Sequence, residues 1–348
     1  MKLFKNIAFI LLSLAGFGSL TSCEKIHTGN GTIVPVVKGV SEGATKSGPV
    51  TTTESIKSIG FVMDAYATEN YIDHTSNTPQ KYAGRYFTES VNYSGNWAME
   101  HEQYWINEVP LRFWCWDRNA EDSGLSMKLY DYSESTRGFL YAMPSDPNKR
   151  RDIVMCYASK TWDEESGDEI DLTFYHPLTS LQFEFSVPSG VTLTKVAAIG
   201  LKTEGAFDMH GDAGSIDSRF IWDAELVDSR PVQRVEESLG PSATGINFYV
   251  VPQKIVEGVT GLELTLQPDG KDAYAVRVIF SNSWTGSSTD HKEWKASHYY
   301  KYRLSVNNAP TDPIGFDINV TLNDWGDMDY NNDGNITDED KITLTPNQ

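Results

Sequence analysis

Residues 181–187 read Leu181-Gln182-Phe183-Glu184-Phe185-Ser186-Val187, a strict alternation of apolar and polar side chains that is typical of a β-strand with one buried face. The pattern recurs in residues 261–266, 275–280 and 300–306, and turn-forming residues separate such segments. A helical period of apolar residues is nearly absent. Many short strands joined by turns predict an all-β protein built from β-sandwiches.

An acidic segment that is poor in apolar residues, 162–169, interrupts this series of strands. Because domain boundaries fall in polar linkers, we expect one sandwich to end and another to begin there. The predicted organisation is a signal peptide at 1–22, a linker at 23–54, sandwiches at 55–165 and 166–326, and an acidic tail at 327–348.

The linker contains one candidate strand, Thr32–Val37, in a region rich in glycine, serine, threonine and lysine. Pro35 lies within it and has no N–H group to donate to a ladder. We therefore expect this strand at the edge of a sheet or in a groove.

The first 22 residues carry two lysines, no acid and an apolar run over residues 7–15. These are features of a secretory signal peptide, and the run is too short to span a membrane comfortably. The segment closes on Leu20-Thr21-Ser22-Cys23, which resembles a bacterial lipobox, in which the cysteine is acylated. We expect an exported lipoprotein, attached through Cys23 to the outer membrane by acyl chains such as palmitate and exposed at the cell surface. The alternative is an ordinary signal peptide that contains a cysteine.

The chain is strongly acidic. Its formal charge is −19, and loss of Lys2 and Lys5 with the signal peptide gives −21 for the mature chain. Such a surface repels nucleic acid, so we expect no nucleic-acid partner.

Two cysteines follow Cys23, and both Cys115 and Cys156 lie in apolar alternations. A free thiol in such a place commonly behaves as a small core residue, whereas a disulfide would suit an exported protein. The sequence leaves both alternatives open, but the two residues are not a catalytic pair.

Catalytic signatures are missing from the sequence. The seven histidines are isolated, and there is no HExxH, no Gly-x-Ser-x-Gly and no phosphate-binding glycine loop. We therefore expect no enzyme activity, and we interpret His176 as a hydrogen-bonded sandwich residue rather than a ligand.

The acidic tail holds a loop that resembles an EF-hand. Oxygen-bearing side chains alternate before and after Gly334, which permits the sharp turn, and an acid stands at position twelve. The alternatives are a weak calcium site and a solvated acidic turn. The candidate calcium ligands are Asp329, Asn331, Asp333, Asn335 and Asp340.

Aromatic residues are abundant, with nine tryptophans among them. Trp114 and Trp116 flank Cys115 and should point to one face, while Trp97, Trp105, Trp284 and Trp294 lie near predicted turns. Such rings can stack on sugars and would suit a glycan-binding surface lipoprotein. The alternative is core packing, where large aromatic side chains bury the most area.

Several segments, taken in order, resemble the fimbrillins, the lipoprotein-derived subunits of type V pili. The central one is Leu172-Thr173-Phe174-Tyr175-His176-Pro177-Leu178, which looks like the Phe-x-His-x-Leu segment of that family. The others are residues 92–97, 104–105, 111–114, 152–155, 248–253 and 294–302.

The resemblance implies two tandem transthyretin-like β-sandwiches and a pilus subunit that serves adhesion. In that family an N-terminal strand is removed by a protease that cuts after arginine, and a strand from another subunit replaces it by β-augmentation. The candidate for the displaced strand is Thr32-Ile33-Val34-Pro35-Val36-Val37. The alternative is a lipid-proximal linker that never pairs.

The chain departs from the family pattern at the cleavage site. Its first arginine after Cys23 is Arg85, and the family's Thr-Arg is replaced by Thr45-Lys46. Either the protease accepts Lys46, or the strand stays in place and the protein is an anchor, a tip or accessory subunit, or a standalone lipoprotein. A glycan-binding lipoprotein that does not polymerise is the alternative function.

Overall fold

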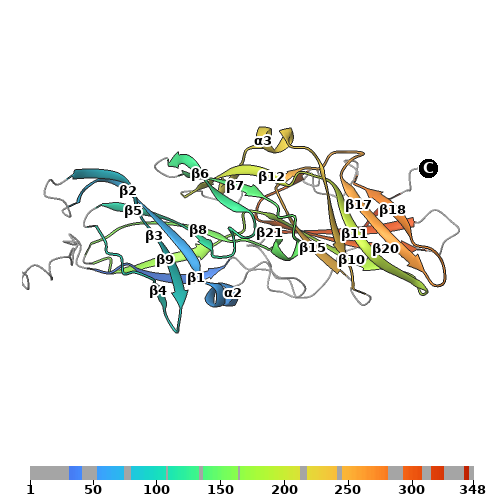
Figure 1. Cartoon of the computed structure of the whole chain (residues 1–348), viewed down its shortest axis with the longest axis horizontal. Coiled ribbons are helices and arrows are strands. Elements are labelled where there is room, and N and C mark those ends of the chain that lie inside the picture. Colours follow the sequence, from blue (N-terminus) through green and yellow to red (C-terminus); the bar gives the residue numbers. More distant parts are fainter. Residues whose placement is uncertain are drawn as a thin grey trace, which may run out of the picture.

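The computed structural model of the chain is elongated and consists mainly of strands, which confirms the predicted all-β class (Figure 1). Three predicted features lie outside the described residues: the lipidation site Cys23, the processing candidate Lys46 and the calcium loop of residues 329–340. The structure describes residues 31–40, 53–73, 80–106, 109–132, 136–163, 165–211, 218–240, 245–280, 293–307, 315–324 and 341–344.

An antiparallel five-stranded sheet organises the N-terminal half. In spatial order its strands are β4 (Trp97–Met99), β3 (Gln80–Tyr93), β2 (Phe61–Asp73), β5 (Pro110–Asp117) and β8 (Met155–Thr161). The short helix α2 (Thr53–Ile59) leads into β2 through Gly60, whose φ of +75° is a conformation that glycine adopts readily.

Strand β5 is buried on both faces of this sheet. Phe113 and Cys115 point into one apolar cluster, and Trp114 and Trp116 point into another on the opposite side. This explains why β5 carries apolar residues at nearly every position from Leu111 to Trp116. The prediction that Trp114 and Trp116 share one face is confirmed.

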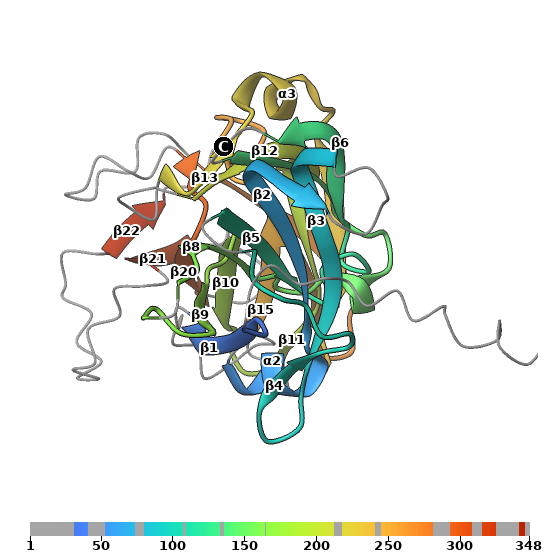
Figure 2. The ribbon, with the colours of Figure 1, turned by 90° about the vertical axis from the view of Figure 1, so that its left-hand side faces the viewer.

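One face of the five-stranded sheet is covered by the pair β1 (Val34–Val40) and β9 (Glu169–Phe174). The other face packs on a four-stranded sheet of order β13 (Phe220–Trp222), β12 (Glu204–His210), β7 (Thr136–Ala142) and β6 (Leu125–Tyr132). Seen from its end in Figure 2, the N-terminal half therefore shows these layers on either side of β2 and β5.

The four-stranded sheet joins residues on both sides of the boundary that we predicted between 165 and 166. Strands β6 and β7 precede it, and β12 and β13 follow it. Strand β9 also follows the boundary but contributes Ile170, Leu172 and Phe174 to the N-terminal core. Hydrogen bonds and core packing thus continue across this point of the sequence.

The C-terminal half is a sandwich of two sheets. One contains β15 (Gly245–Val250), β10 (Thr179–Ser186), β20 (His298–Asn307), β21 (Gly315–Asp324) and β22 (Lys341–Leu344). The other contains β14 (Gln233–Ser238), β11 (Val191–Leu201), β17 (Gly261–Pro268) and β18 (Tyr274–Ile279). Leu181, Phe183 and Phe185 of β10 point into their common core, as the alternation over 181–187 predicts.

The remaining elements are short. They are the 3₁₀ helix η1 (Pro147–Lys149), the helix α3 (Ala224–Ser229) and the two-stranded pair β16 (Gln253–Lys254) with β19 (Glu293–Trp294). Asp223 caps α3 by accepting a hydrogen bond from the N–H of Leu226 at 2.9 Å.

Buried polar groups join the two halves. His176 Nδ1 lies 3.0 Å from Asp152 Oδ1, and neither side chain is exposed. The hydroxyl of Ser297 donates to the carbonyl of His176 at 2.5 Å, and that of Thr179 donates to the carbonyl of Lys295 at 2.6 Å. The interpretation of His176 as a hydrogen-bonded sandwich residue is confirmed.

Asp117, at the end of β5, is a buried carboxyl group close to this region. Its oxygens accept hydrogen bonds from the N–H groups of Val154 at 2.9 Å and Asn119 at 3.0 Å. Burial outweighs these donors and, with a smaller contribution from the charge of Asp152, raises the pKa of Asp117 from 3.8 to about 7.

This shift predicts a pH-dependent stability. Between the unfolded pKa of 3.8 and the folded pKa of about 7, the folded state keeps a proton on Asp117 that the unfolded state has lost. The protonated Asp117 therefore contributes its full amount to the free energy of unfolding below pH 3.8. That contribution falls as pH rises toward 7, by up to about 1.4 kcal/mol per pH unit. Urea unfolding of wild type and Asp117→Asn from pH 4.5 to 8 measures how the free energy of unfolding changes with pH. The wild-type curve should fall more steeply than that of the variant up to pH 7, and equal slopes would contradict the assignment.

Candidate functional site around β9

Strand β1 lies parallel to β9, with Val34 opposite Glu169 and Val40 opposite Phe174. Among the described strands, β9 is the one that forms a ladder with β1. The N–H of Val34 donates to the carbonyl of Asp168 at 3.0 Å, so the alternation of a parallel ladder directs the nitrogen of Pro35 away from β9. The predicted edge position of the strand around Pro35 is confirmed, and the strand begins and ends slightly later than predicted.

The residues just before β1 are held from two sides. The N–H of Ile33 donates to the carbonyl of Gln103 at 2.8 Å, and the N–H of Trp105 donates to the carbonyl of Gly31 at 3.1 Å. Asp168 contacts the chain from the other side through the bond to Val34. The chain therefore enters the site between two backbone segments.

The side chains of this segment reach the core of the N-terminal half. Ile33 and Val40 are buried, with exposed fractions of 2% and 5%, and both belong to the cluster around β5. Burying one aliphatic side chain of this size contributes about 1.5–3 kcal/mol. Lys38 forms an ion pair with Asp171 at 3.1 Å, but both groups are exposed, so the pair contributes little.

The acidic segment 162–169 is a well-anchored turn between β8 and β9. The ammonium group of Lys160 donates to the carbonyls of Ser166, Gly167 and Glu169, at 2.9, 2.7 and 2.7 Å. Trp162 Nε1 donates to the carboxylate of Asp168 at 3.0 Å, and Trp105 Nε1 donates to its carbonyl at 3.0 Å. These bonds fix Asp168 beside the start of β1.

Gly31 fits into the space that Asp168 leaves. A Cβ atom on Gly31 would lie 1.7 Å from Asp168 Oδ1, far inside van der Waals contact. Asp168 has little freedom to retreat, because Trp162 and Trp105 hold its side chain and backbone. The site therefore favours glycine at this position just before β1.

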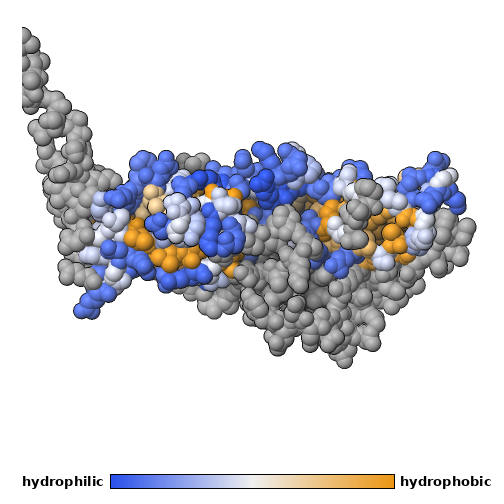
Figure 3. All heavy atoms as spheres, turned by 90° about the horizontal axis from the view of Figure 1, so that it is seen from below, coloured by the Kyte–Doolittle hydropathy of each residue, from blue (hydrophilic) through white to orange (hydrophobic). Residues whose placement is uncertain are grey.

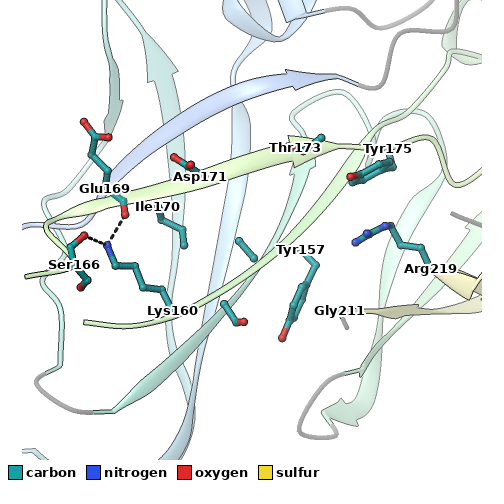
Figure 4. Close-up of a pocket in the computed structure, with 12 residues that line it drawn as sticks. Tyr157, Lys160, Ser166, Glu169, Ile170, Asp171, Thr173, Tyr175, Gly211 and Arg219 are labelled. Carbon is teal, nitrogen blue, oxygen red and sulfur yellow. Dashed lines mark hydrogen bonds between the residues drawn. The ribbon is translucent and has the colours of Figure 1, made fainter. Parts of the chain in front are cut away.

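A polar groove lies along the edge of β9 that faces β8 (Figure 4). The two strands exchange backbone hydrogen bonds at Met155 and Tyr175, at 2.8 and 2.7 Å, and Lys160 ties them together at the other end. Between these ties the groove has a volume of about 640 Å³. Its lining comes from Tyr157, Ala158, Ser159, Lys160, Ser166, Glu169, Ile170, Asp171, Thr173, Tyr175, Gly211 and Arg219.

The described tryptophans that we considered for glycan stacking are core residues. Trp105, Trp114, Trp116 and Trp294 are at most 1% exposed, and Trp97 is 9% exposed. Their packing confirms the core interpretation, while Trp284 lies outside the described residues.

Cys115 and Cys156 are both free and buried, and they lie opposite one another on β5 and β8. Burial, together with a hydrogen bond to Cys156, raises the pKa of the Cys115 thiol. They behave in this structure as small core residues.

Among the described residues, no group of three histidine, cysteine, aspartate or glutamate side chains could hold a metal ion. Within the same residues, no helix has the length and apolar character needed to cross a membrane. The predicted calcium loop lies outside this part of the chain and stays a prediction.

The strand at this site is predicted from the sequence, but most of the residues that hold it are not. Gly31, Gln103 and Trp105 are far from Asp168 in sequence and meet it only through the fold. The acidic segment itself carried one signal, because Asp163, Ser166 and Gly167 are turn-forming residues.

The fold and the site together define an all-β protein in which strand β1 lies at the edge of a sandwich. The profile of the fimbrillin-like family matches residues 51–325. The chain belongs to the fimbrillin-like family.

Solved structures with a similar course of the chain include a fimbrial protein from Bacteroides vulgatus, with 13% identity, 85% of this chain and 100% of that chain covered, and a TM-score of 0.49. The tip fimbrial protein Mfa3 from Porphyromonas gingivalis has 13% identity, 76% and 94% coverage, and a TM-score of 0.39. No curated protein sequence matches the chain.

The glycine at position 31, just before β1, can be tested with Gly39 of β1 as the control. Gly31→Ala should loosen β1 by about 1–3 kcal/mol, because the added methyl group collides with Asp168. Hydrogen exchange of the amides in Val34–Val40 should accelerate by about 5- to 150-fold if local opening controls it. Gly39→Ala, whose Cβ meets nothing within 4 Å, should leave exchange nearly unchanged. Equal effects of the two substitutions would show that Asp168 does not restrict this position.

Proposed function

We propose that this protein is a cell-surface lipoprotein of the pilus system, an adhesion subunit in which β1 occupies a strand-exchange site. The observation that carries the proposal is the position of β1, which forms a ladder with β9, while Val40 of the strand and Ile33 just before it fill apolar positions of the core. Membership of the fimbrillin-like family supports it, since fimbrillins are subunits of surface appendages.

Removal of β1 would leave an acceptor for another strand. The edge of β9 would lose its backbone partner, and the positions of Ile33 and Val40 would be open to water. A strand from another subunit could restore both, with main-chain hydrogen bonds supplying affinity and alternate side chains fixing the register. The partners proposed here are therefore other pilus subunits.

The sequence before β1 indicates how the protein would be attached to the membrane. Acylation at Cys23 would hold the protein at the outer membrane, and release would require a cut after Val40, for which Lys46 is the candidate. Because no arginine stands between Cys23 and Gly84, we propose that the tether is retained and that the protein acts as an anchor or accessory subunit.

A disulfide across β1 and β9 tests strand exchange. Val36 and Asp171 are register partners on adjacent strands, so Val36→Cys with Asp171→Cys should form a bridge after oxidation. A fluorescent synthetic peptide with the sequence of residues 30–42 is added in excess, in urea below the unfolding transition. The reduced variant should take up the peptide, and the oxidised variant should take up at least tenfold less.

The same variant in its reduced form is the matched control, and a peptide of scrambled sequence controls for non-specific uptake. Equal uptake by the oxidised and reduced forms, or no uptake by either, would argue against exchange of β1.

The retained tether predicts the N-terminus of the protein on cells. Mass spectrometry of the membrane-bound protein should find an acylated peptide that begins at Cys23, and Cys23→Ser should abolish its membrane attachment. A mature chain that begins at Ser47 would instead show cleavage after Lys46 and would exclude the permanent anchor.

A further inference from the structure

The groove between β8 and β9 is lined by one arginine side chain, Arg219, that forms no ion pair with a carboxylate of the described residues. Arg219, just before β13, places its guanidinium carbon 4.2 Å from the centre of the Tyr175 ring. Its Nε atom is buried and makes no hydrogen bond within the described part of the chain. No described acidic side chain lies within ion-pair distance of it.

The chain is acidic, with 48 acidic and 29 basic residues, and many of its described arginines are paired with carboxylates. Those with ion pairs are Arg85, Arg137, Arg150, Arg230, Arg234 and Arg277. Arg219 lines the groove without such a partner among the residues that the structure describes. The charge of Arg219 is thus available to a ligand in the groove.

Two tyrosines and a glycine surround Arg219 at its end of the groove. Tyr157 packs directly on the backbone of Gly211, where a Cβ atom would lie 2.0 Å from the ring. In Figure 4, Arg219 points toward the groove between Tyr157 and Tyr175, while Glu169 and Asp171 lie toward the other end. Asp171 is moreover paired with Lys38. The end of the groove near Arg219 therefore carries net positive charge.

We infer that this groove binds a saccharide that carries a carboxylate group, with the carboxylate on Arg219. A guanidinium group donates two parallel hydrogen bonds to a carboxylate, and this geometry suits recognition of such a ligand. The hydroxyl groups of Ser159 and Thr173 and the rings of Tyr157 and Tyr175 offer the polar and aromatic contacts that a sugar ring uses. The volume of about 640 Å³ lies in the range of small-molecule sites.

An extended acidic peptide fits the groove less well. Only Ala158 and Ile170 among the lining residues are aliphatic, so the groove lacks pockets for alternate apolar side chains. Highly charged polyanions are repelled by a chain with a net charge of −19, whereas a ligand with few carboxylates avoids most of this repulsion.

The inference does not depend on strand exchange. The groove uses the edge of β9 that faces β8, whereas β1 occupies the opposite edge. Loss of β1 exchange would therefore leave the saccharide site untouched, and loss of saccharide binding would leave β1 in place.

Isothermal titration of the full chain with digalacturonate and with its dimethyl ester tests the inference, because the ester keeps the saccharide and replaces each charged carboxylate by a neutral methyl ester. Wild type should bind digalacturonate, and the ester should bind at least tenfold more weakly. Arg219→Gln should weaken digalacturonate binding at least tenfold. Arg151→Gln removes an exposed charge outside the groove and should leave binding unchanged.

Thermal melting of each variant establishes that it is folded, and the comparison of acid with ester on wild type holds even if Arg219→Gln does not fold. Absence of binding to wild type, equal binding of acid and ester, or full binding by folded Arg219→Gln would each overturn the inference. Equal affinity for the acidic peptide N-acetyl-Glu-Glu-amide would also overturn it, since it would replace the saccharide by a peptide ligand.

Discussion

Burial of both faces of β5 is the constraint on which the N-terminal half depends. Phe113 and Cys115 require a cover on one side, and Trp114 and Trp116 require a cover on the other. A simple sandwich supplies only one covered face for each sheet. Strands β1 and β9 cover the face of Phe113 and Cys115. Strands β6, β7, β12 and β13 cover the face of Trp114 and Trp116. A buried ion pair between Arg137 of β7 and Asp64 of β2, at 3.1 Å, joins the middle layers.

The position of β1 follows from the same constraint. A segment close to the predicted lipid attachment site at Cys23 is part of the core, because Ile33 and Val40 help to cover β5. It is also at an edge of that cover, since β9 is the described strand that forms a ladder with it. A strand that completes the core yet lies at an edge is suited to replacement by another of similar pattern. Asp168, held by two tryptophans, restricts which strand can do so through the contact with Gly31.

The turn of residues 162–169 shows how the two edges of β9 are coupled. Lys160 binds three carbonyl groups of the turn and lies 5.2 Å from the centre of the Trp105 ring. The same lysine closes one end of the groove that contains Arg219. The strand site and the groove thus share one rigid support, although they use opposite edges of β9.

Much of the fold could be predicted from the sequence, because alternation in segments such as 181–187 reports local burial directly. The sequence by itself determined the all-β class, the edge position of the strand around Pro35 and the common face of Trp114 and Trp116, whereas their burial in the core was decided by the structure. In the acidic segment 162–169 the pattern did not show that Lys160 would bind the backbone carbonyls of the turn, or that hydrogen bonds and core packing continue across it. Only the tertiary structure decided that β12 and β13 join β7, that Asp168 meets Gly31 and that Arg219 lies over Tyr175. These contacts join residues far apart in sequence, and strand order and side-chain packing, which no local pattern encodes, bring them together.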